Sequence, residues 1–429
     1  MLLRIRQLTN LGYSVADQAL SAGGMFLLNV MLARTLSKVD YGVFVLSYSV
    51  FTFLAGLHNA ALLEPYTVYG AGRYHSNFRQ YLRLMLGSNL VVCGGLTALL
   101  LLGLGVLHWV SPPLASKTMF GLSLALGVML TAGLVRRTFY IERRFRRAVC
   151  TAILFFAFLS CGLWASLRAG WLNGFSVFVI VALSWMLAWL ATARDLVRRP
   201  QGPSFLSTHP QYWREHWRYA GWVLATSLIF QVSSQGYYWL VAGFVSTREV
   251  AELRAMYMMV APVEQLFVAF SYLMLPRMAL HYASGRIGDF VHVWKRYCWL
   301  VVMATTGMAI MVRLFGRPIV HRLYAGKYDG SIHLLFLCSL VPILTLIGNT
   351  MNDGLKAAER PNMVFYAYCT SGVATFIVGI PLVRHFGAAG AVYGMLVSAA
   401  AFAATLAVAF AVLIQRSPRI TASANITAP

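Results

Sequence analysis

Carboxylates inside long apolar stretches are the residues of this sequence that could do chemistry. Glu264 stands near the middle of one stretch, two residues after Pro262, and Asp17 and Glu64 lie in two earlier stretches. A carboxylate at the centre of a membrane helix costs roughly 2.5–3.5 kcal/mol on insertion scales, so it usually faces a cavity or a partner. Each of the three could bind a proton or a cation, or accept hydrogen bonds from hydroxyl groups. Glu264 could equally be the structural partner of a buried arginine or tyrosine. Asp17 and Glu64 could pair with Arg73 or another cytoplasmic arginine, and this role fits them better because they lie nearer the cytoplasmic ends of their stretches.

Neutral polar side chains form two stripes at the i, i+3, i+4, i+7 spacing that places residues on one face of a helix. The two stripes consist of Gln231, Ser234, Gln235 and Tyr238, and of Asn349, Asn352, Asp353 and Lys356. Amides and hydroxyls on one face suit a hydrated pathway that binds sugars. The alternative is hydrogen bonding between neighbouring helices, which is worth about 0.6 kcal/mol on average inside membranes. Asp353 and Lys356 would also fit a plain solvated helix end.

Arginine is densest between residues 136 and 147, where phenylalanine and tyrosine are interleaved with it. The four residues singled out from this cluster are Arg143, Arg144, Arg146 and Arg147. A polybasic segment beside a membrane helix is attracted to anionic lipid, and this is the simplest interpretation. Because arginine makes bidentate contacts with phosphate, a second interpretation is the attraction of an anionic diphosphate headgroup. The aromatic residues would also suit RNA, but the apolar composition makes a membrane the expected partner, and we expect no nucleic acid.

Transmembrane helices are the elements that must position these residues. The chain of 429 residues is 59% hydrophobic and 11% charged, whereas soluble proteins carry about 25% charged residues. A soluble enzyme is therefore nearly excluded. Twelve apolar stretches are long enough to cross a bilayer, so we predict an all-α polytopic membrane protein with about twelve transmembrane helices in two six-helix lobes. The stretches cover residues 12–35, 42–70, 82–110, 117–140, 148–168, 171–193, 219–245, 250–276, 296–315, 332–356, 362–383 and 387–414.

The distribution of positive charge predicts the orientation in the membrane. If the N-terminus is cytoplasmic, about two thirds of the 35 Lys and Arg residues fall in cytoplasmic segments, in accord with the positive-inside rule. An even number of spans then places both termini in the cytoplasm. Prolines mark the longest interior break, and similar hairpins on either side of it predict two lobes related by a parallel repeat. The predicted N-terminal lobe covers residues 1–195, and the predicted C-terminal lobe covers residues 219–415. A predicted cytoplasmic linker joins them at 196–218, and a predicted cytoplasmic tail follows at 416–429.

Catalytic and metal-binding motifs are absent from the sequence. It contains no HExxH, no phosphate-binding GxxxxGK and no GxGxxG after a strand, and none of its six cysteines has CxxC spacing. We therefore predict a protein that is not an enzyme and that has no catalytic residues, no metal and no cofactor. Any active transport would not be powered by ATP hydrolysed on this chain.

Several short motifs lie at residues 16–21, 32–34, 40–42, 57–59, 64–65, 261–262 and 275–277. They resemble those of bacterial polysaccharide transporters, within the multidrug/oligosaccharidyl-lipid/polysaccharide (MOP) exporter superfamily. The resemblance implies six plus six helices around a central cavity in the bacterial cytoplasmic (inner) membrane. It also implies that the substrate is an undecaprenyl-diphosphate-linked oligosaccharide repeat unit, which is flipped for the synthesis of O-antigen, capsule or exopolysaccharide. Membrane lipid and polysaccharide assembly proteins are then the expected partners.

The mechanism expected from this resemblance is alternating access, in which the lobes rock around a polar cavity between the first, second, seventh and eighth spans. Coupling to protons or sodium is a weaker expectation. A drug or metabolite exporter of the same superfamily is the nearest alternative. A membrane-embedded glycan polymerase or ligase is an alternative of another class, but it would need a long external loop. The longest external break, at about residues 313–331, is too short to be a folded domain.

Overall fold

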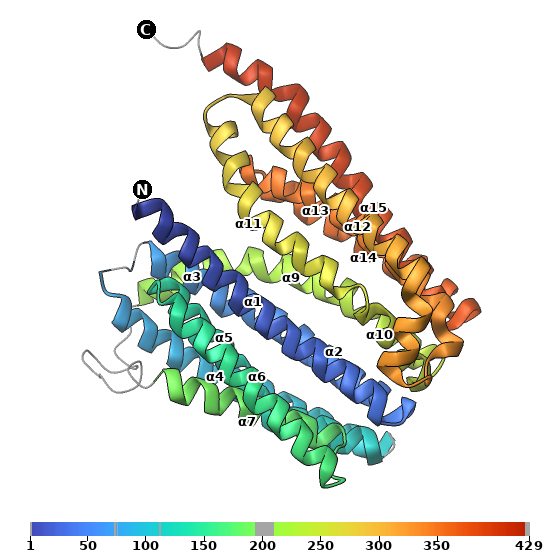
Figure 1. Cartoon of the computed structure of the whole chain (residues 1–429). Helices are drawn as coiled ribbons and strands as arrows, with labels where there is room; N and C mark the ends of the chain where they lie inside the picture. The colour runs from blue at the N-terminus through green and yellow to red at the C-terminus, as the bar shows by residue number, and fades with distance from the viewer. Residues whose placement is uncertain (1, 73, 75, 111–112, 194–209, 425–429) are drawn as a thin grey trace. The chain divides into compact units, whose positions relative to one another are not determined.

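The computed structural model describes residues 2–72, 74, 76–110, 113–193 and 210–424. Every regular element in these ranges is a helix and none is a strand, which confirms the prediction of an all-helical protein (Figure 1). Most of the predicted linker, at 196–209, lies outside the described residues, as does the end of the predicted tail. The remaining residues of the predicted linker, 210–218, form the beginning of a helix.

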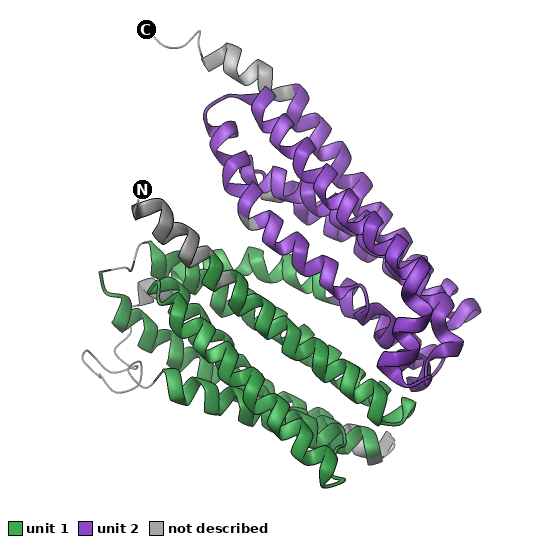
Figure 2. Cartoon of the chain, in the orientation of Figure 1, with its two compact units in different colours: residues 1–231 green, residues 232–429 purple. Residues whose placement is uncertain are grey.

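The chain divides by its contacts into two compact units, Met1–Gln231 and Val232–Pro429 (Figure 2). The boundary lies inside a single helix, α9 (Pro210–Phe244), so this helix contributes its first part to unit 1 and its second part to unit 2. The boundaries given above for the two lobes remain predictions.

Unit 1 is built around α5, which packs against α2, α4 and α7, while α6 packs against α1 and α7. A close approach of α5 to α7 requires glycine at position 121, since a Cβ there would lie 3.0 Å from the backbone of Phe175. This approach lets the two helices bury their apolar faces against each other. The helices of this unit before α9 are α1 (Leu2–Thr35), α2 (Lys38–His58), α3 (Glu64–Ala71), α4 (Phe78–Val110), α5 (Pro113–Ile141), α6 (Phe145–Arg168) and α7 (Gly174–Thr192).

Unit 2 is built around α13, which packs against α11, α12 and α15, while α14 packs against α15. Its core includes the buried aromatic side chains of Phe290, Tyr297, Phe402 and Phe410. After α9, the helices of unit 2 are α10 (Thr247–Met258), α11 (Ala261–Ala283), α12 (Ile287–Tyr324), a 3₁₀ turn at Asp329–Ser331, α13 (Ile332–Ala357), α14 (Pro361–Ile377) and α15 (Gly379–Ala424).

Nine helices or continuous helical segments among the described residues are long and apolar enough to cross a membrane, and a bent pair of helices makes ten. Two of the twelve predicted spans, 219–245 and 362–383, are not among them. They correspond to α9, whose centre is interrupted by polar residues such as Gln231 and Gln235, and to α14, which is only 17 residues long. These spans nevertheless define a multi-pass membrane protein.

Two spans are broken rather than continuous. The predicted eighth span consists of α10 and α11, which meet at a 48° bend. Pro262 therefore stands in the first turn of α11, where its missing N–H costs nothing, and not in the middle of a helix as the sequence suggested. The second break is in α15 at Gly387, whose φ of 59° and ψ of −136° only glycine adopts readily. It coincides with the predicted start of the twelfth span.

Candidate functional site

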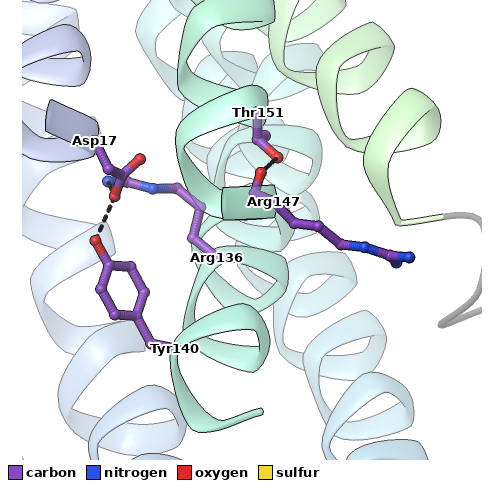
Figure 3. Close-up of polar contacts among 5 residues, drawn as sticks. All are labelled: Asp17, Arg136, Tyr140, Arg147 and Thr151. Carbon is purple, nitrogen blue, oxygen red and sulfur yellow. Dashed lines mark hydrogen bonds and ion pairs between the residues drawn. The ribbon is translucent and has the colours of Figure 1, made fainter. Parts of the chain in front are cut away.

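The carboxylate of Asp17 on α1 is completely buried in unit 1, where two side chains of α5 bind it (Figure 3). The Arg136 guanidinium lies 2.6 Å from one carboxylate oxygen, and the Tyr140 hydroxyl donates a 2.6 Å hydrogen bond to the same oxygen. The guanidinium also lies 5.8 Å from the ring centroid of Trp185. Its charge neutralises that of Asp17, so this site is an ion pair with a cation–π contact and not an isolated acid.

The second span contains a wide π-helical turn, Asn59–Leu63, between α2 and α3. Pro65 follows it and has no N–H to donate to the carbonyl group of Ala61, one helical turn earlier. The Nε2 atom of His216, on α9, donates to that carbonyl oxygen at 2.7 Å. Glu64, the first residue of α3, is half-buried beside this turn. Single π-helical turns inside α-helices are frequently found at functional sites.

The predicted stripe on α9 divides between the two units. In unit 1 the Gln231 side chain is buried against Gly56 of α2, and Ser227 donates a hydrogen bond to the Gly56 carbonyl oxygen. Further along α9, Gln235 donates to the exposed Ser234. Gln231 therefore packs against α2, while the rest of the stripe belongs to unit 2.

Glu264 lies in the first turn of α11, directly after the bend from α10. The helix dipole favours a negative charge at this end of a helix. The Tyr257 hydroxyl donates a 2.8 Å hydrogen bond to it, and Arg254 attracts it electrostatically. Arg254 also donates a 3.3 Å hydrogen bond to Tyr238, and its guanidinium lies 5.7 Å from the centroid of that ring. Glu264, Tyr238 and two residues of α10 thus form one polar cluster in unit 2.

Asp353 on α13 is the centre of a second cluster in unit 2. Its carboxylate accepts hydrogen bonds from Ser271 on α11, at 2.6 Å, and from Tyr297 on α12, at 3.0 Å. The neighbouring side chain of Asn352 is buried and lies beside Tyr368 on α14. Asn349, one turn earlier on α13, is only half-buried, and Lys356 is exposed. The carboxylate and one amide of this stripe therefore face neighbouring helices.

The four arginines at the junction of α5 and α6 point in different directions. Arg144 forms an ion pair with Glu142 at 3.0 Å, whereas Arg143 and Arg146 are exposed. Figure 3 shows the Arg147 side chain directed away from Asp17, and its guanidinium donates a 3.5 Å hydrogen bond to the Thr192 carbonyl oxygen. Only Arg144 of the four lines a cavity at this end of unit 1.

The sequence did not reveal that tyrosine side chains are partners of the buried carboxylates. Asp17, Glu264 and Asp353 each accept a hydrogen bond from a tyrosine hydroxyl. Of these tyrosines, only Tyr140 carried a signal in the sequence, because it lies four residues after Arg136 and so on the same face of α5. Arg254, near the start of the predicted stretch 250–276, was also missed as a candidate. The described residues contain no group of three or more His, Cys, Asp or Glu side chains that could hold a metal ion.

These features define a polytopic helical membrane protein with buried polar clusters in both of its compact units. No protein-family model matches the sequence, and no curated protein matches it either. Solved structures do match its fold. An inward-facing multidrug resistance MATE family transporter of the MOP superfamily has a TM-score of 0.78 at 12% identity, over 94% of this chain and 96% of that one.

Two further structures extend this comparison. The lipid II flippase MurJ, in an inward closed conformation, has a TM-score of 0.74 at 12% identity, over 97% of this chain and 92% of its own. A MOP superfamily transporter from Pyrococcus furiosus, described as having a binding pocket of reverse polarity, has a TM-score of 0.66 at 12% identity, over 95% of each chain. The chain therefore has the fold of the MOP superfamily, in which about twelve helices form two lobes.

Proposed function

We propose that this protein is a transporter that flips undecaprenyl-diphosphate-linked oligosaccharide repeat units across the bacterial cytoplasmic membrane by alternating access. The observation that carries the proposal is the fold shared with a lipid II flippase along nearly the whole of both chains. The resemblance of the sequence motifs to polysaccharide transporters supports the same class of substrate. The glycan would serve O-antigen, capsule or exopolysaccharide synthesis.

The chemistry of the buried clusters supports a polyhydroxylated substrate. Asp17 is neutralised by Arg136, while Glu264 and Asp353 are held by hydroxyl groups. Amides and hydroxyls that donate and accept hydrogen bonds can exchange their partners for sugar hydroxyls at little net cost. Residues proposed to line the pathway or couple an ion are Asp17, Glu64, Gln231, Ser234, Gln235, Tyr238, Glu264, Asn349, Asn352 and Asp353.

An ion-coupled drug or metabolite exporter is the second candidate, and the MATE fold match, with its TM-score of 0.78, favours it. An exporter of cationic compounds would need a carboxylate free to pair with its substrate. The ion pair of Asp17 with Arg136 weighs against this function for unit 1. Glu264 and Asp353 have no ion pair of this kind among the described residues, so an exporter would use them.

Complementation of a flippase-null strain tests the proposed function. The wild-type chain should restore surface glycan, whereas Glu264→Ala and Gln231→Ala should restore much less at the same protein level. Gln265→Ala is the matched control, because Gln265 is exposed beside Glu264 on α11. Full restoration by both test variants would reject these residues as pathway lining. Failure of the wild-type chain, together with acquired drug resistance, would establish the exporter instead.

Ion coupling requires a separate measurement. Flipping of a fluorescent lipid-linked oligosaccharide in vesicles that contain the purified protein should depend on a proton or sodium gradient. Flipping at an equal rate with neither gradient would reject the coupling, while leaving the flippase function intact.

A further inference from the structure

A cavity of about 610 Å³ opens in unit 1 between the beginning of α4 and the end of α5. Ligand sites typically occupy about 300–1,000 Å³, so this one has room for a diphosphate group and part of an attached molecule. The predicted orientation places it at the cytoplasmic end of the helices. Its polar lining consists of Ser76, Asn77, Arg79, Gln80, Glu142 and Arg144.

Two arginines give the cavity its chemistry. Arg79 comes from the first turn of α4 and Arg144 from the turn that follows α5. Within the described residues, Arg79 forms no ion pair, and Arg144 is paired through its Nε atom with Glu142. The pair uses only the Nε atom of Arg144 and leaves its two terminal nitrogens for another acceptor. Arginine guanidinium groups bind phosphate through parallel hydrogen bonds.

The backbone adds to the attraction of an anion. Residues 78–80 of the lining belong to the first turn of α4, a helix of 33 residues. The Gln80 amide already donates to the Asn77 carbonyl oxygen at 3.0 Å, whereas the amides of Phe78 and Arg79 precede the first acceptors within the helix. The helix dipole favours negative charge at this end of the helix. Glu142 is the one carboxylate in the lining, and it opposes an anion. The two arginines and this carboxylate together carry a net positive charge.

We propose that this cavity binds the phosphate or diphosphate group of a membrane lipid, with Arg79 and Arg144 as its cationic contacts. A phosphodiester of the bilayer and the diphosphate of a polyprenyl lipid share this chemistry. The identification of the bound lipid as the transported one rests on the proposed function. The proposal that the cavity binds a lipid phosphate does not rest on the proposed function, because binding is measured without transport.

The binding experiment uses the full chain in nanodiscs of a zwitterionic lipid, titrated with undecaprenyl diphosphate, with phosphatidylglycerol and with inorganic diphosphate. Bound lipid is counted by native mass spectrometry, and inorganic diphosphate is used as the competitor. Arg79→Ala and Arg144→Ala should each weaken binding about tenfold, as expected for the loss of a charge-assisted contact. Glu142→Gln should strengthen binding, because it removes the opposing charge.

Arg296→Ala is the matched control, since it removes one exposed positive charge from α12, far along the chain from the cavity residues. It should bind as the wild type does. Competition by inorganic diphosphate would identify the phosphate group as the part recognised, and stronger binding of undecaprenyl diphosphate than of phosphatidylglycerol would identify the polyprenyl source. The reverse order would identify a bilayer lipid.

Equal affinity of the wild type and all three cavity variants would overturn the proposal, as would binding that inorganic diphosphate does not reduce. Folding is checked by size-exclusion chromatography and by melting temperature. Should an alanine variant fail to fold, the Glu142→Gln variant still decides, because the proposal requires its affinity to rise. Loss of lipid binding with normal flipping would reject a role in transport and retain the site.

Discussion

The Nε2 atom of His216 lies 2.7 Å from the carbonyl oxygen of Ala61. Because a carbonyl only accepts, the imidazole proton is on Nε2, and the buried Nδ1 atom has no hydrogen-bond partner among the described groups. Protonation would place a second N–H, and a positive charge, where nothing described accepts it. This relationship makes His216 a neutral histidine that binds the carbonyl group which Pro65 leaves without a donor.

The hydrogen bond predicts a pH dependence of stability. Burial lowers the pKa of His216, which precedes the predicted span on α9, below its ordinary value of 6.5. The folded protein then binds fewer protons than the unfolded chain, so its stability is fully present above pH 6.5 and is lost as the pH falls below that value. Melting temperatures between pH 5 and pH 8 should show this decline for the wild type. His216→Gln should flatten it, and an unchanged slope in that variant would contradict the assignment.

The Asp17–Arg136 ion pair predicts a large effect of a small substitution. Removing one partner of a buried pair costs about 3–5 kcal/mol. Because the Arg136 side chain is 22% exposed, we expect Asp17→Asn to cost about 1–3 kcal/mol. The double variant Asp17→Asn, Arg136→Gln should be more stable than the sum of the single changes implies. Denaturation in detergent measures the coupling, and strict additivity would show that the pair is not formed.

The break in α15 predicts that alanine is not tolerated at position 387. A Cβ there would lie 2.5 Å from a carboxylate oxygen of Glu249, which also accepts a hydrogen bond from the backbone N–H of Ala388. The positive φ adds strain of order 1–3 kcal/mol. Gly387→Ala should therefore lower the melting temperature clearly. Gly307→Ala on α12 has open space around its Cβ and should be neutral or slightly stabilising; an equal loss in both variants would refute this explanation.

The backbone conformation of Arg143 predicts that glycine at this position stabilises the protein. Its φ of 56° lies in the left-handed region, just after the end of α5. This conformation costs an L-residue about 1 kcal/mol that glycine does not pay. Arg143→Gly should therefore raise the melting temperature. Arg146→Gly removes the same charge from the first turn of α6 and should lower it, because glycine disfavours a helix by about 1 kcal/mol. A rise in both variants would indicate an effect of charge alone.

Most of the spans were predictable from the sequence because hydropathy and length are local properties. The partners of the polar residues were not predictable, because they come from other helices. Asp353 on α13, for example, accepts hydrogen bonds from Ser271 on α11 and from Tyr297 on α12. The bend between α10 and α11 also escaped prediction. It follows Met258, at residues that are neither glycine nor proline, while the nearby Pro262 simply begins the next helix. Gly387 was identifiable as the start of a span, but its conformation depends on Glu249.

The pairing of Asp17 with Arg136 has a consequence for biogenesis. The two residues are 119 positions apart in the chain, and at a synthesis rate of 5–20 residues per second the arginine leaves the ribosome on the order of 10 s after the aspartate. During that interval α1 carries an uncompensated carboxylate. Its stable insertion therefore depends on the arrival of α5, and chains that end before residue 136 should leave α1 poorly held in the bilayer.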